Sequence, residues 1–399
     1  MSAASSKIVV RHLYKIFGQH GQAQRAQKLL EKGYDKSRLN RETGAVVGVN
    51  DVSFDVKEGE IFVLMGLSGS GKSTLIRLVN RLITPTAGEV LIGGEDVLKM
   101  GQRELTALRR REMSMVFQSF ALMPNRNVLG NAAFGLEVAG MGRAKRESMA
   151  TEVLEQVGLG DFKHSRIDEL SGGMRQRVGL ARALAVNPSL IIMDEAFSAL
   201  DPLIRREMQD ILLELQQQHR RTVLFVSHDI EEAMRIGNRI AIMEGGSMVQ
   251  VGTPQEIIAS PANDYVRNFF ATIDTSRFLS AASLAMEDVP VYALGHALPG
   301  LAELKSSLGD HQEPYAIVVN EKRYPVGLVE PERLATEAID AVSRDHLSPI
   351  MTVDADVSLD NVMKAFTDTS APLAVVDEEG CFQGAITQQA LFARLREVR

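Results

Sequence analysis

The chain has 399 residues, the length of two or three ordinary domains, and its 45% hydrophobic and 24% charged residues exclude a disordered protein. A formal net charge of −7 argues against a protein that coats nucleic acid, because neutralising phosphates requires a basic excess. The single cysteine, Cys381, permits no internal disulfide, and no apolar run approaches the roughly 18 residues of a membrane-spanning helix. The chain also starts without a basic-then-apolar leader, so we expect a protein of the reducing cytosol. Any role at a membrane is then expected to depend on partner proteins.

The two ends of the chain differ in charge. Residues 1–281 contain 35 Lys/Arg and 32 Asp/Glu, a net charge of +3, whereas residues 282–399 contain 9 and 19, a net charge of −10. This asymmetry predicts two different domains.

The first part alternates short apolar runs with longer amphipathic segments. Five runs are predicted to be strands: Ile61–Met65, Met113–Phe117, Leu190–Met193, Thr222–Val226 and Arg239–Met243. Two sets of apolar residues recur between them at helical spacing: Leu75, Leu78, Val79 and Leu82, and then Met208, Ile211, Leu212 and Leu215. The alternation predicts an α/β fold around a mostly parallel sheet.

Residues 18–45 interrupt this alternation. Arg25, Lys28, Lys32 and Lys36 recur every three or four residues, which predicts a basic stripe along one side of a short helix that Gly33 weakens. A solvated insertion with outward-facing charges is one interpretation of this segment. Contact with anionic lipid head groups or with a partner protein is the other.

The strongest motif is a glycine-rich loop between an apolar strand and an apolar-periodic helix, Gly66-Leu67-Ser68-Gly69-Ser70-Gly71-Lys72-Ser73-Thr74. Its glycines allow backbone N–H groups to turn inward around a β-phosphate. Lys72 is then expected to reach the β- and γ-phosphate oxygens, and the Ser73 hydroxyl is placed for Mg²⁺. The spacing and context predict an ATP site with Mg²⁺ as cofactor.

A second apolar run ends in two acids, Asp194 and Glu195. Because unpaired carboxylates at the tip of a buried strand are costly, the pair indicates a nearby cation. We expect Asp194 to hold Mg²⁺ and Glu195 to orient and deprotonate the attacking water. His228, at the end of the next strand, is expected close to the γ-phosphate.

A third segment precedes an Ala/Leu-rich helical run: Leu170-Ser171-Gly172-Gly173-Met174-Arg175-Gln176-Arg177. Together with the two motifs above it resembles the signature of the ATP-binding-cassette family, with Met174 in place of the usual Gln. The resemblance spans roughly residues 8–270. It implies a P-loop NTPase cassette over residues 1–270, with the 18–45 insertion and a helical subdomain at about 118–170.

The resemblance also implies roles for further residues. Gln118 corresponds to the Q-loop glutamine, a catalytic residue and Mg²⁺ ligand, Asp201 to the D-loop, His228 to the switch histidine, and Phe17 to an aromatic residue that stacks on adenine. Ser171, Gly172 and Gly173 form an anion-binding cap at a helix N-terminus. In the family this cap closes on the ATP of a second cassette, so the chain is expected to form a homodimer that encloses two ATP molecules.

Two longer stretches, residues 117–126 and 194–205, look like the ATPase subunit of glycine betaine/proline importers, as do the insertion and the C-terminal part. The resemblance implies an ATPase that energises import of such compatible solutes. Its implied partners are integral-membrane permease subunits and, indirectly, an extracytoplasmic solute-binding protein. Its implied location is peripheral, at the cytoplasmic face of the inner membrane. Choline, carnitine and other small zwitterions remain alternative solutes, because other subunits select the solute.

Residues 282–399 contain two related halves. Residues 315–319 with 327–329, and residues 374–377 with 384–386, each predict a strand, a turn and a second strand. The pair resembles tandem cystathionine-β-synthase-type (CBS) modules, which are regulatory α+β elements that often bind adenosyl ligands. The second half has Thr387 but Ala390 where such sites carry a hydroxyl and then an acid, so a structural or dimer-stabilising tail is the alternative.

Two other classes of protein fit less well. A cassette ATPase acting on DNA or ribosomes is expected to carry tandem cassettes, zinc-binding cysteines or a long coiled insertion. A small-molecule kinase leaves the segment around Ser171 unexplained. No nucleic-acid partner is therefore expected.

Overall fold

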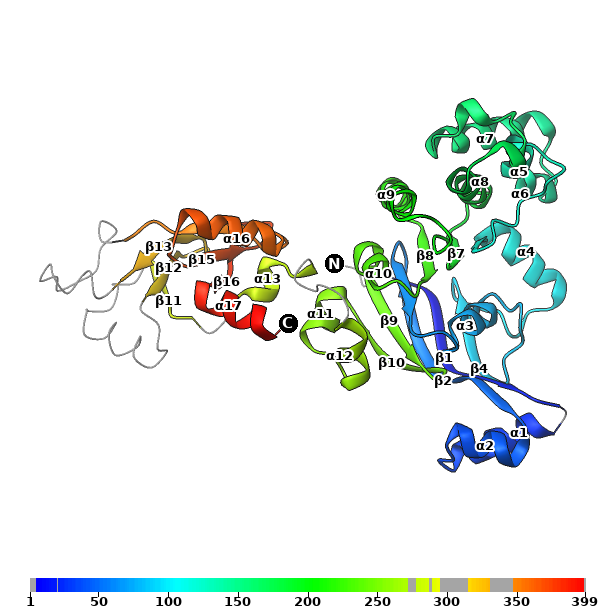
Figure 1. Cartoon of the computed structure of the whole chain (residues 1–399), viewed down its shortest axis with the longest axis horizontal. Helices are drawn as coiled ribbons and strands as arrows, with labels where there is room; N and C mark the ends of the chain where they lie inside the picture. The colour runs from blue at the N-terminus through cyan, green and yellow to red at the C-terminus, as the bar shows by residue number, and fades with distance from the viewer. Residues whose placement is uncertain are drawn as a thin grey trace, which may run out of the picture. The chain divides into compact units, whose positions relative to one another are not determined.

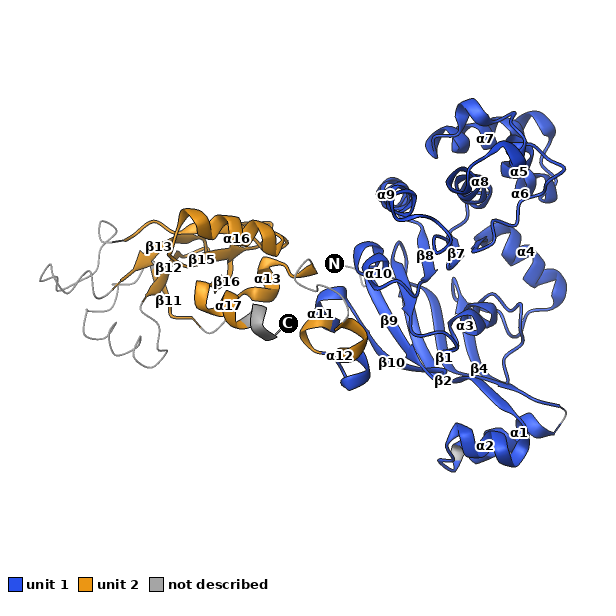
Figure 2. Ribbon diagram, in the orientation of Figure 1, with its two compact units in different colours: residues 1–257, 261–266 blue, residues 258–260, 267–399 orange. Residues whose placement is uncertain are grey.

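A computed structural model of the chain describes residues 5–19, 21–271, 278–286, 289–294, 315–330 and 347–397; the rest of the predicted 282–399 domain lies outside these ranges. The chain divides into two compact units (Figure 2), the first comprising residues 1–257 and 261–266 and the second residues 258–260 and 267–399.

The first unit is built on a six-stranded sheet in the order β10-β9-β3-β8-β7-β6. The strands are β10 (Ser247–Gly252), β9 (Arg239–Glu244), β3 (Ile61–Met65), β8 (Thr222–Val226), β7 (Leu190–Asp194) and β6 (Met113–Phe117). All neighbours are parallel except β10, which pairs antiparallel with β9. The five predicted strands and the parallel sheet are therefore confirmed, and the carboxyl ends of these parallel strands meet at one edge of the sheet.

An antiparallel sheet, in the order β2-β1-β4-β5, packs against the first (Figure 1). Its strands are β1 (Ser6–Phe17), β2 (Val46–Lys57), β4 (Ala87–Ile92) and β5 (Glu95–Asp96). One hydrophobic core joins the two sheets, with the rings of Phe54 and Phe62 stacked at 5.3 Å between centroids. Such a pair contributes about 0.5–1.5 kcal/mol beyond its buried area.

Helices that lie between strands of this unit include α3 (Lys72–Val79), α4 (Gln102–Glu112), α9 (Pro202–His219) and α10 (Ile230–Ile236). Two further helices, α11 (Pro254–Ala259) and α12 (Asp264–Phe270), follow β10, and each is divided between the two units. The prediction that Leu82 continues the helix after the glycine-rich loop is wrong. The helix ends at Val79, where Asn80 is the C-cap, and Leu82 is 56% exposed. In α9 the expected apolar face is present, with Met208, Leu212 and Leu215 buried.

Residues 128–185 add a layer of helices (Figure 1). It contains α5 (Val128–Ala132), α6 (Phe134–Val138), α7 (Arg143–Gln156) and α8 (Gly172–Ala185), with short 3₁₀ turns at Gly160–Phe162 and Ile167–Glu169. Helix α8 contacts α5, α6 and α7, and its N-terminus begins directly after Ser171.

The insertion forms two helices rather than the one predicted. Helix α1 (Gln22–Glu31) ends before Gly33, whose φ of 80° lies in the left-handed region, and α2 (Lys36–Thr43) begins after Asp35 accepts a hydrogen bond from the Arg38 N–H at 2.9 Å. Lys36 therefore does not continue the stripe of Arg25, Lys28 and Lys32, because the chain turns at Gly33.

The second unit contains two three-stranded sheets of the same design. In each, a parallel pair is followed by an antiparallel pair with one register shift. The strands are β11 (Val291–Leu294), β12 (Ala316–Asn320) and β13 (Pro325–Val329), and then β14 (Met351–Asp354), β15 (Leu373–Val376) and β16 (Phe382–Ile386). Among its described residues, this unit also contains helices α13 (Ala281–Leu284), α16 (Leu359–Asp368) and α17 (Gln388–Glu397). The two predicted strand pairs are confirmed.

None of the helices in the described ranges has the length and apolar character needed to span a bilayer.

Candidate functional site

The glycine-rich loop joins the carboxyl end of β3 to the N-terminus of α3. Gly66, Gly69 and Gly71 have φ values of 145°, 79° and 101°, a region that favours glycine. A Cβ at Gly66 would collide with the Met243 carbonyl oxygen, and one at Gly71 would lie 2.5 Å from the Gly48 carbonyl oxygen. The loop can fold this tightly only without side chains at these positions, and it presents the N–H groups of a helix N-terminus.

Lys72 lies buried within this loop. Its ammonium donates hydrogen bonds to the carbonyl oxygens of Gly66 at 2.7 Å and Leu67 at 3.0 Å. Burial lowers the pKa of Lys72, while the carboxylates of Glu195 and Asp194 act in the opposite direction. The loop therefore holds a cation at the end of β3, as phosphate binding requires.

The hydroxyl residues of the loop differ in exposure. Ser68 is exposed, whereas Ser73 and Thr74 lie half-buried in the first turn of α3. The Ser70 hydroxyl is buried and has no hydrogen-bond partner within the described part of the chain. An unsatisfied buried donor beside a cation is suited to an anionic ligand, so the loop fits a nucleotide phosphate.

Ser73 and Asp194 come together although 121 residues separate them. The Ser73 hydroxyl donates to Asp194 Oδ1 at 3.3 Å. Burial raises the pKa of Asp194, and the hydrogen bond from Ser73 opposes this shift. A hydroxyl and a carboxylate at this spacing are the hard oxygen ligands that Mg²⁺ prefers, so Ser73 and Asp194, two of the three predicted ligands, fit the ion.

Glu195 and His228 face each other at the ends of β7 and β8. The distance from Glu195 Oε2 to His228 Nδ1 is 3.4 Å. Glu195 has a φ of 48°, and its N–H donates to the Val226 carbonyl oxygen at 3.1 Å. A non-glycine residue in this left-handed region is uncommon, and such strained conformations concentrate at functional sites.

Gln118 reaches this cluster through a residue that sequence reasoning missed as a site residue, Ser198. Gln118 Nε2 donates to Ser198 Oγ at 3.1 Å, and Ser198 Oγ donates to the Glu195 carbonyl oxygen at 2.9 Å. Gln118, which is expected to be a catalytic residue and Mg²⁺ ligand, is thereby linked to Glu195, the predicted catalytic base. No local pattern marks this link, because Gln118 and Ser198 are 80 residues apart.

Phe17 lies at the end of β1 and is 40% exposed. Its ring packs so closely over Gly48 that a Cβ there would lie 2.7 Å from ring atom Cε2. The Lys15 ammonium lies 5.1 Å from the ring centroid. Because the Gly48 carbonyl oxygen also approaches Gly71, Phe17 and the glycine-rich loop lie on two sides of the same residue.

The segment 171–173 lies elsewhere in the unit. The Ser171 hydroxyl accepts a hydrogen bond from the Met174 N–H at 3.3 Å and caps α8, and Asp201 caps α9 in the same way through the Ile204 N–H at 3.1 Å. A Cβ at Gly173 would clash with the Ile204 side chain, so Gly173 allows the two helices to approach. Within the described ranges, no hydrogen bond or ion pair joins residues 171–173 to the loop at 66–74.

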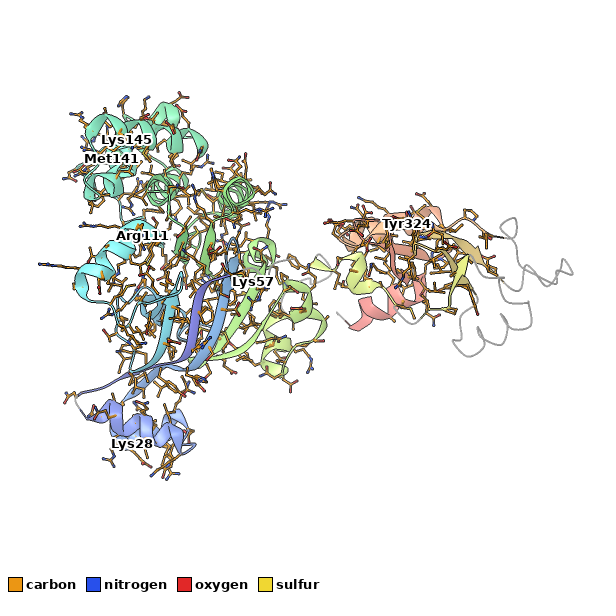
Figure 3. The ribbon with its side chains drawn as sticks, turned by 180° about the vertical axis from the view of Figure 1, so that it is seen from behind. Lys28, Lys57, Arg111, Met141, Lys145 and Tyr324 are labelled. Carbon is orange, nitrogen blue, oxygen red and sulfur yellow. The ribbon has the colours of Figure 1, made fainter. Side chains whose placement is uncertain are left out.

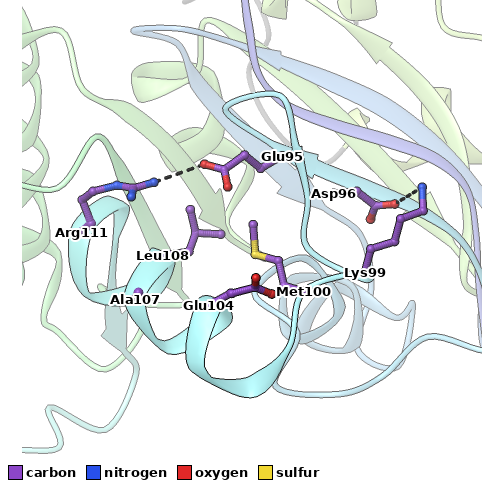
Figure 4. Close-up of a pocket in the computed structure, with 8 residues that line it drawn as sticks. All are labelled: Glu95, Asp96, Lys99, Met100, Glu104, Ala107, Leu108 and Arg111. Carbon is purple, nitrogen blue, oxygen red and sulfur yellow. Dashed lines mark hydrogen bonds and ion pairs between the residues drawn. The ribbon is translucent and has the colours of Figure 1, made fainter.

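A separate pocket of about 510 Å³ lies between β5 and α4 (Figure 4). Ion pairs join Glu95 to Arg111 at 3.2 Å and the nearby residues Asp96 and Lys99 to each other at 2.8 Å. Glu104 accepts a hydrogen bond from the Gly101 N–H at 2.8 Å. Its charged groups are thus already partnered within the protein, and the pocket does not include the predicted nucleotide residues.

Comparison with known proteins identifies the family of the chain. The sequence model of the family described as "ABC transporter" matches residues 49–198. The glycine betaine/proline betaine transport system ATP-binding protein ProV of Salmonella typhimurium is 49% identical over 98% of this chain and 97% of its own length. The glycine betaine/carnitine transport ATP-binding protein GbuA of Listeria monocytogenes is 44% identical over 98% of both chains.

A solved structure supports the fold. The ATP-binding cassette MJ0796, determined as a dimer in a post-hydrolysis state with ADP and Pi, is 30% identical, with a TM-score of 0.52 over 62% of this chain and 98% of that chain.

Proposed function

The chain belongs to the ABC transporter family as an ATP-binding subunit of the glycine betaine/proline betaine type, and we propose that it hydrolyses ATP to energise import of such compatible solutes through a membrane permease. The observation that carries the proposal is the meeting of Lys72, Ser73, Asp194, Glu195 and His228 at one edge of the sheet. It unites a phosphate-binding cation, two oxygen ligands and a carboxylate–histidine pair.

In this proposal each of these side chains has a separate task. Lys72 neutralises phosphate charge, and Ser73, Asp194 and Gln118 would hold Mg²⁺, which supplies charge stabilisation for phosphoryl transfer. Glu195 accepts the proton of the attacking water, and His228 lies within reach of Glu195 to orient the γ-phosphate. Ser198 positions Gln118 relative to Glu195.

We further propose that two copies of the chain close around two nucleotides. Ser171, Gly172 and Gly173 form an anion-binding helix end that no hydrogen bond or ion pair among the described residues joins to the glycine-rich loop, as expected of a cap that acts on a second copy. The dimeric relative with ADP and Pi supports this assembly. Asp201, which caps α9 beside Gly173, belongs to the same surface in the proposal.

The second unit is proposed to be a tandem CBS-like regulatory module. The repeated sheet, with the same pairing order and the same register shift in both halves, supports this. In this proposal the partners of the chain are a membrane permease and a solute-binding protein, and the chain lies at the cytoplasmic face of the membrane. The names of the full-length relatives as transport ATP-binding proteins support this.

The test is solute uptake by proteoliposomes that contain the chain and its permease, with the solute-binding protein added. We expect ATP-dependent uptake of labelled glycine betaine or proline betaine. Because GbuA is named for glycine betaine and carnitine, carnitine and choline are measured in parallel. Wild-type uptake without ATP, or ATP hydrolysis that is unaffected by the Glu195→Gln change, would contradict the proposal.

A further inference from the structure

Lys36, the first residue of α2 in the insertion, is a half-buried cation. Burial lowers the pKa of its ammonium. Within the described residues, no carboxylate lies at ion-pair distance from it. Its neighbour Arg38 is different, because it is exposed, donates to Glu42 Oε1 at 2.9 Å and packs over the Tyr34 ring. Lys28, labelled in Figure 3, is also exposed.

The Lys36 ammonium lies over the turn between β9 and β10. Its nitrogen is 3.7 Å from the Cβ position of Gly245 and 3.3 Å from that of Gly246. The Gly246 N–H donates to the carbonyl oxygen of Ser70 at 2.9 Å. Gly246 therefore lies between the Lys36 ammonium, which is close to it, and the glycine-rich loop, to which it donates a hydrogen bond.

Gly48 is the point where these elements converge. Its carbonyl oxygen lies 2.5 Å from the Cβ position of Gly71 and 2.7 Å from that of Gly246, and its Cβ position is 2.7 Å from the Phe17 ring. Gly48 is thus surrounded by the turn below Lys36, the glycine-rich loop and Phe17, the residue expected to stack on adenine. A nucleotide that stacks on Phe17 and places its phosphates on the loop must pass this point.

We propose that Lys36 supplies a second cation to the bound nucleotide, on its ribose and α-phosphate side, while Lys72 serves the β- and γ-phosphates. The inference rests on the proposed ATP binding. A half-buried ammonium with no carboxylate partner is stabilised more by a nearby phosphate than an exposed ammonium that already has an ion-pair partner. On this view the insertion is part of the nucleotide site and not only a solvated appendage.

The experiment compares the full-length wild type with Lys36→Gln, Lys36→Arg and Arg38→Gln. Arg38→Gln removes one positive charge from the same insertion and is the matched control. Dissociation constants for MgATP and MgADP are measured by isothermal titration calorimetry at low and high salt, and unfolding midpoints confirm that each variant is folded. We expect Lys36→Gln to weaken both nucleotides by about 5- to 10-fold at low salt, with less weakening at high salt.

Two further results are expected. Lys36→Arg keeps the charge and should restore most of the affinity, and Arg38→Gln should bind like the wild type. Equal loss for ADP and ATP distinguishes Lys36 from a residue that contacts the γ-phosphate. The inference is overturned if the wild type binds MgATP and Lys36→Gln binds it with the affinity and salt dependence of Arg38→Gln. A wild type that does not bind MgATP would instead overturn the proposed function.

Discussion

The guanidinium of Arg205 and the carboxylate of Asp229 form an ion pair at 2.5 Å. Arg205 also donates to the carbonyl oxygen of Leu200 at 3.1 Å, in the segment that precedes α9. Asp229, directly after His228, caps α10 by accepting from the Glu232 N–H at 3.1 Å. One side chain therefore fixes the segment of Ser198 and Asp201 against the segment of His228.

We expect Arg205→Gln to lower the kcat of ATP hydrolysis by about 5- to 50-fold with little change in KM, because it releases His228 without altering the phosphate loop. Loss of one partner of a partly buried pair costs on the order of 1–3 kcal/mol, which matches this range. Steady-state kinetics measure both parameters. Arg206→Gln, at an exposed neighbour, is the control. Equal effects of the two changes would show that the pair does not position the histidine.

Glu195→Gln is expected to reduce hydrolysis by about 10²- to 10⁴-fold, the usual contribution of a general base. The amide keeps the shape of the side chain, so MgATP binding should persist. Losing the negative charge beside the phosphates should also favour an ATP-bound dimer. Phosphate release and light scattering with MgATP measure the two effects, with Glu58→Gln at an exposed position as control. Wild-type turnover in Glu195→Gln would remove Glu195 from the mechanism.

The parallel sheet was predictable because strands buried on both faces read as continuous apolar runs. Strands β6 and β8 begin and end at the predicted residues. The helix after the loop was overextended to Leu82, since an exposed leucine can share the helical period by chance.

The rest of the site depends on tertiary contacts that leave no local pattern. Ser198 meets Gln118 across 80 residues, and Lys36 meets the turn at Gly246 across more than half of the chain. The prediction of a single helix in the insertion is wrong because Gly33 adopts a left-handed conformation. The chain turns there, so Lys36 does not lie on the basic stripe.

Ser171→Arg tests whether the cap at α8 acts on a second copy. The change places a bulky cation at the helix N-terminus, where no hydrogen bond or ion pair of the described residues reaches Lys72 or Ser73, so monomeric MgATP binding should survive while ATP-driven dimerisation fails. Analytical ultracentrifugation with MgATP measures the dimer. Mixing Ser171→Arg with Lys72→Ala should allow at most one competent site in each mixed dimer. Loss of nucleotide binding by the monomer would show instead that the cap acts within one chain.

Glu112 predicts a pH dependence of stability. The hydrogen bond from Ser189 and then those from Lys7 and Arg111 lower the pKa of this carboxyl to about 2 in the folded protein. Since the folded pKa is below the unfolded value of 4.5, the stabilisation is present above pH 4.5 and is lost as the pH falls toward 2.

We expect Glu112→Gln to lower the free energy of unfolding by about 1–2 kcal/mol at pH 7, a figure reduced from the full shift because Glu112 is partly solvated. The variant should also flatten the dependence of stability on pH between 4.5 and 2. Urea unfolding at a series of pH values measures this. A variant that loses stability on acidification as steeply as the wild type would place the titration elsewhere.

The second unit predicts a response of transport to ionic strength. Residues 282–399 carry 9 basic and 19 acidic residues. Each surface Lys or Arg contributes roughly 1 kcal/mol to binding an anionic membrane, so an acidic excess makes such binding unfavourable for this part of the chain. Its acidic charges can instead repel one another or attract the net-positive residues 1–281. Either interaction weakens as the Debye length falls from about 10 Å at 0.1 M to about 3 Å at 1 M salt.

A chain that ends after Ala271 is therefore expected to keep basal ATPase activity but to lose the salt dependence of transport in proteoliposomes. The cut must precede Leu279 and Ala281, because both side chains are buried in the core of the second unit. In the full-length chain, Glu378→Gln with Glu379→Gln removes two exposed acidic charges without touching that core, and should shift activation to lower ionic strength. If the shortened chain and the double variant both kept the wild-type activation curve, the second unit would be a structural element and not a sensor, because neither its presence nor its charge would affect the response.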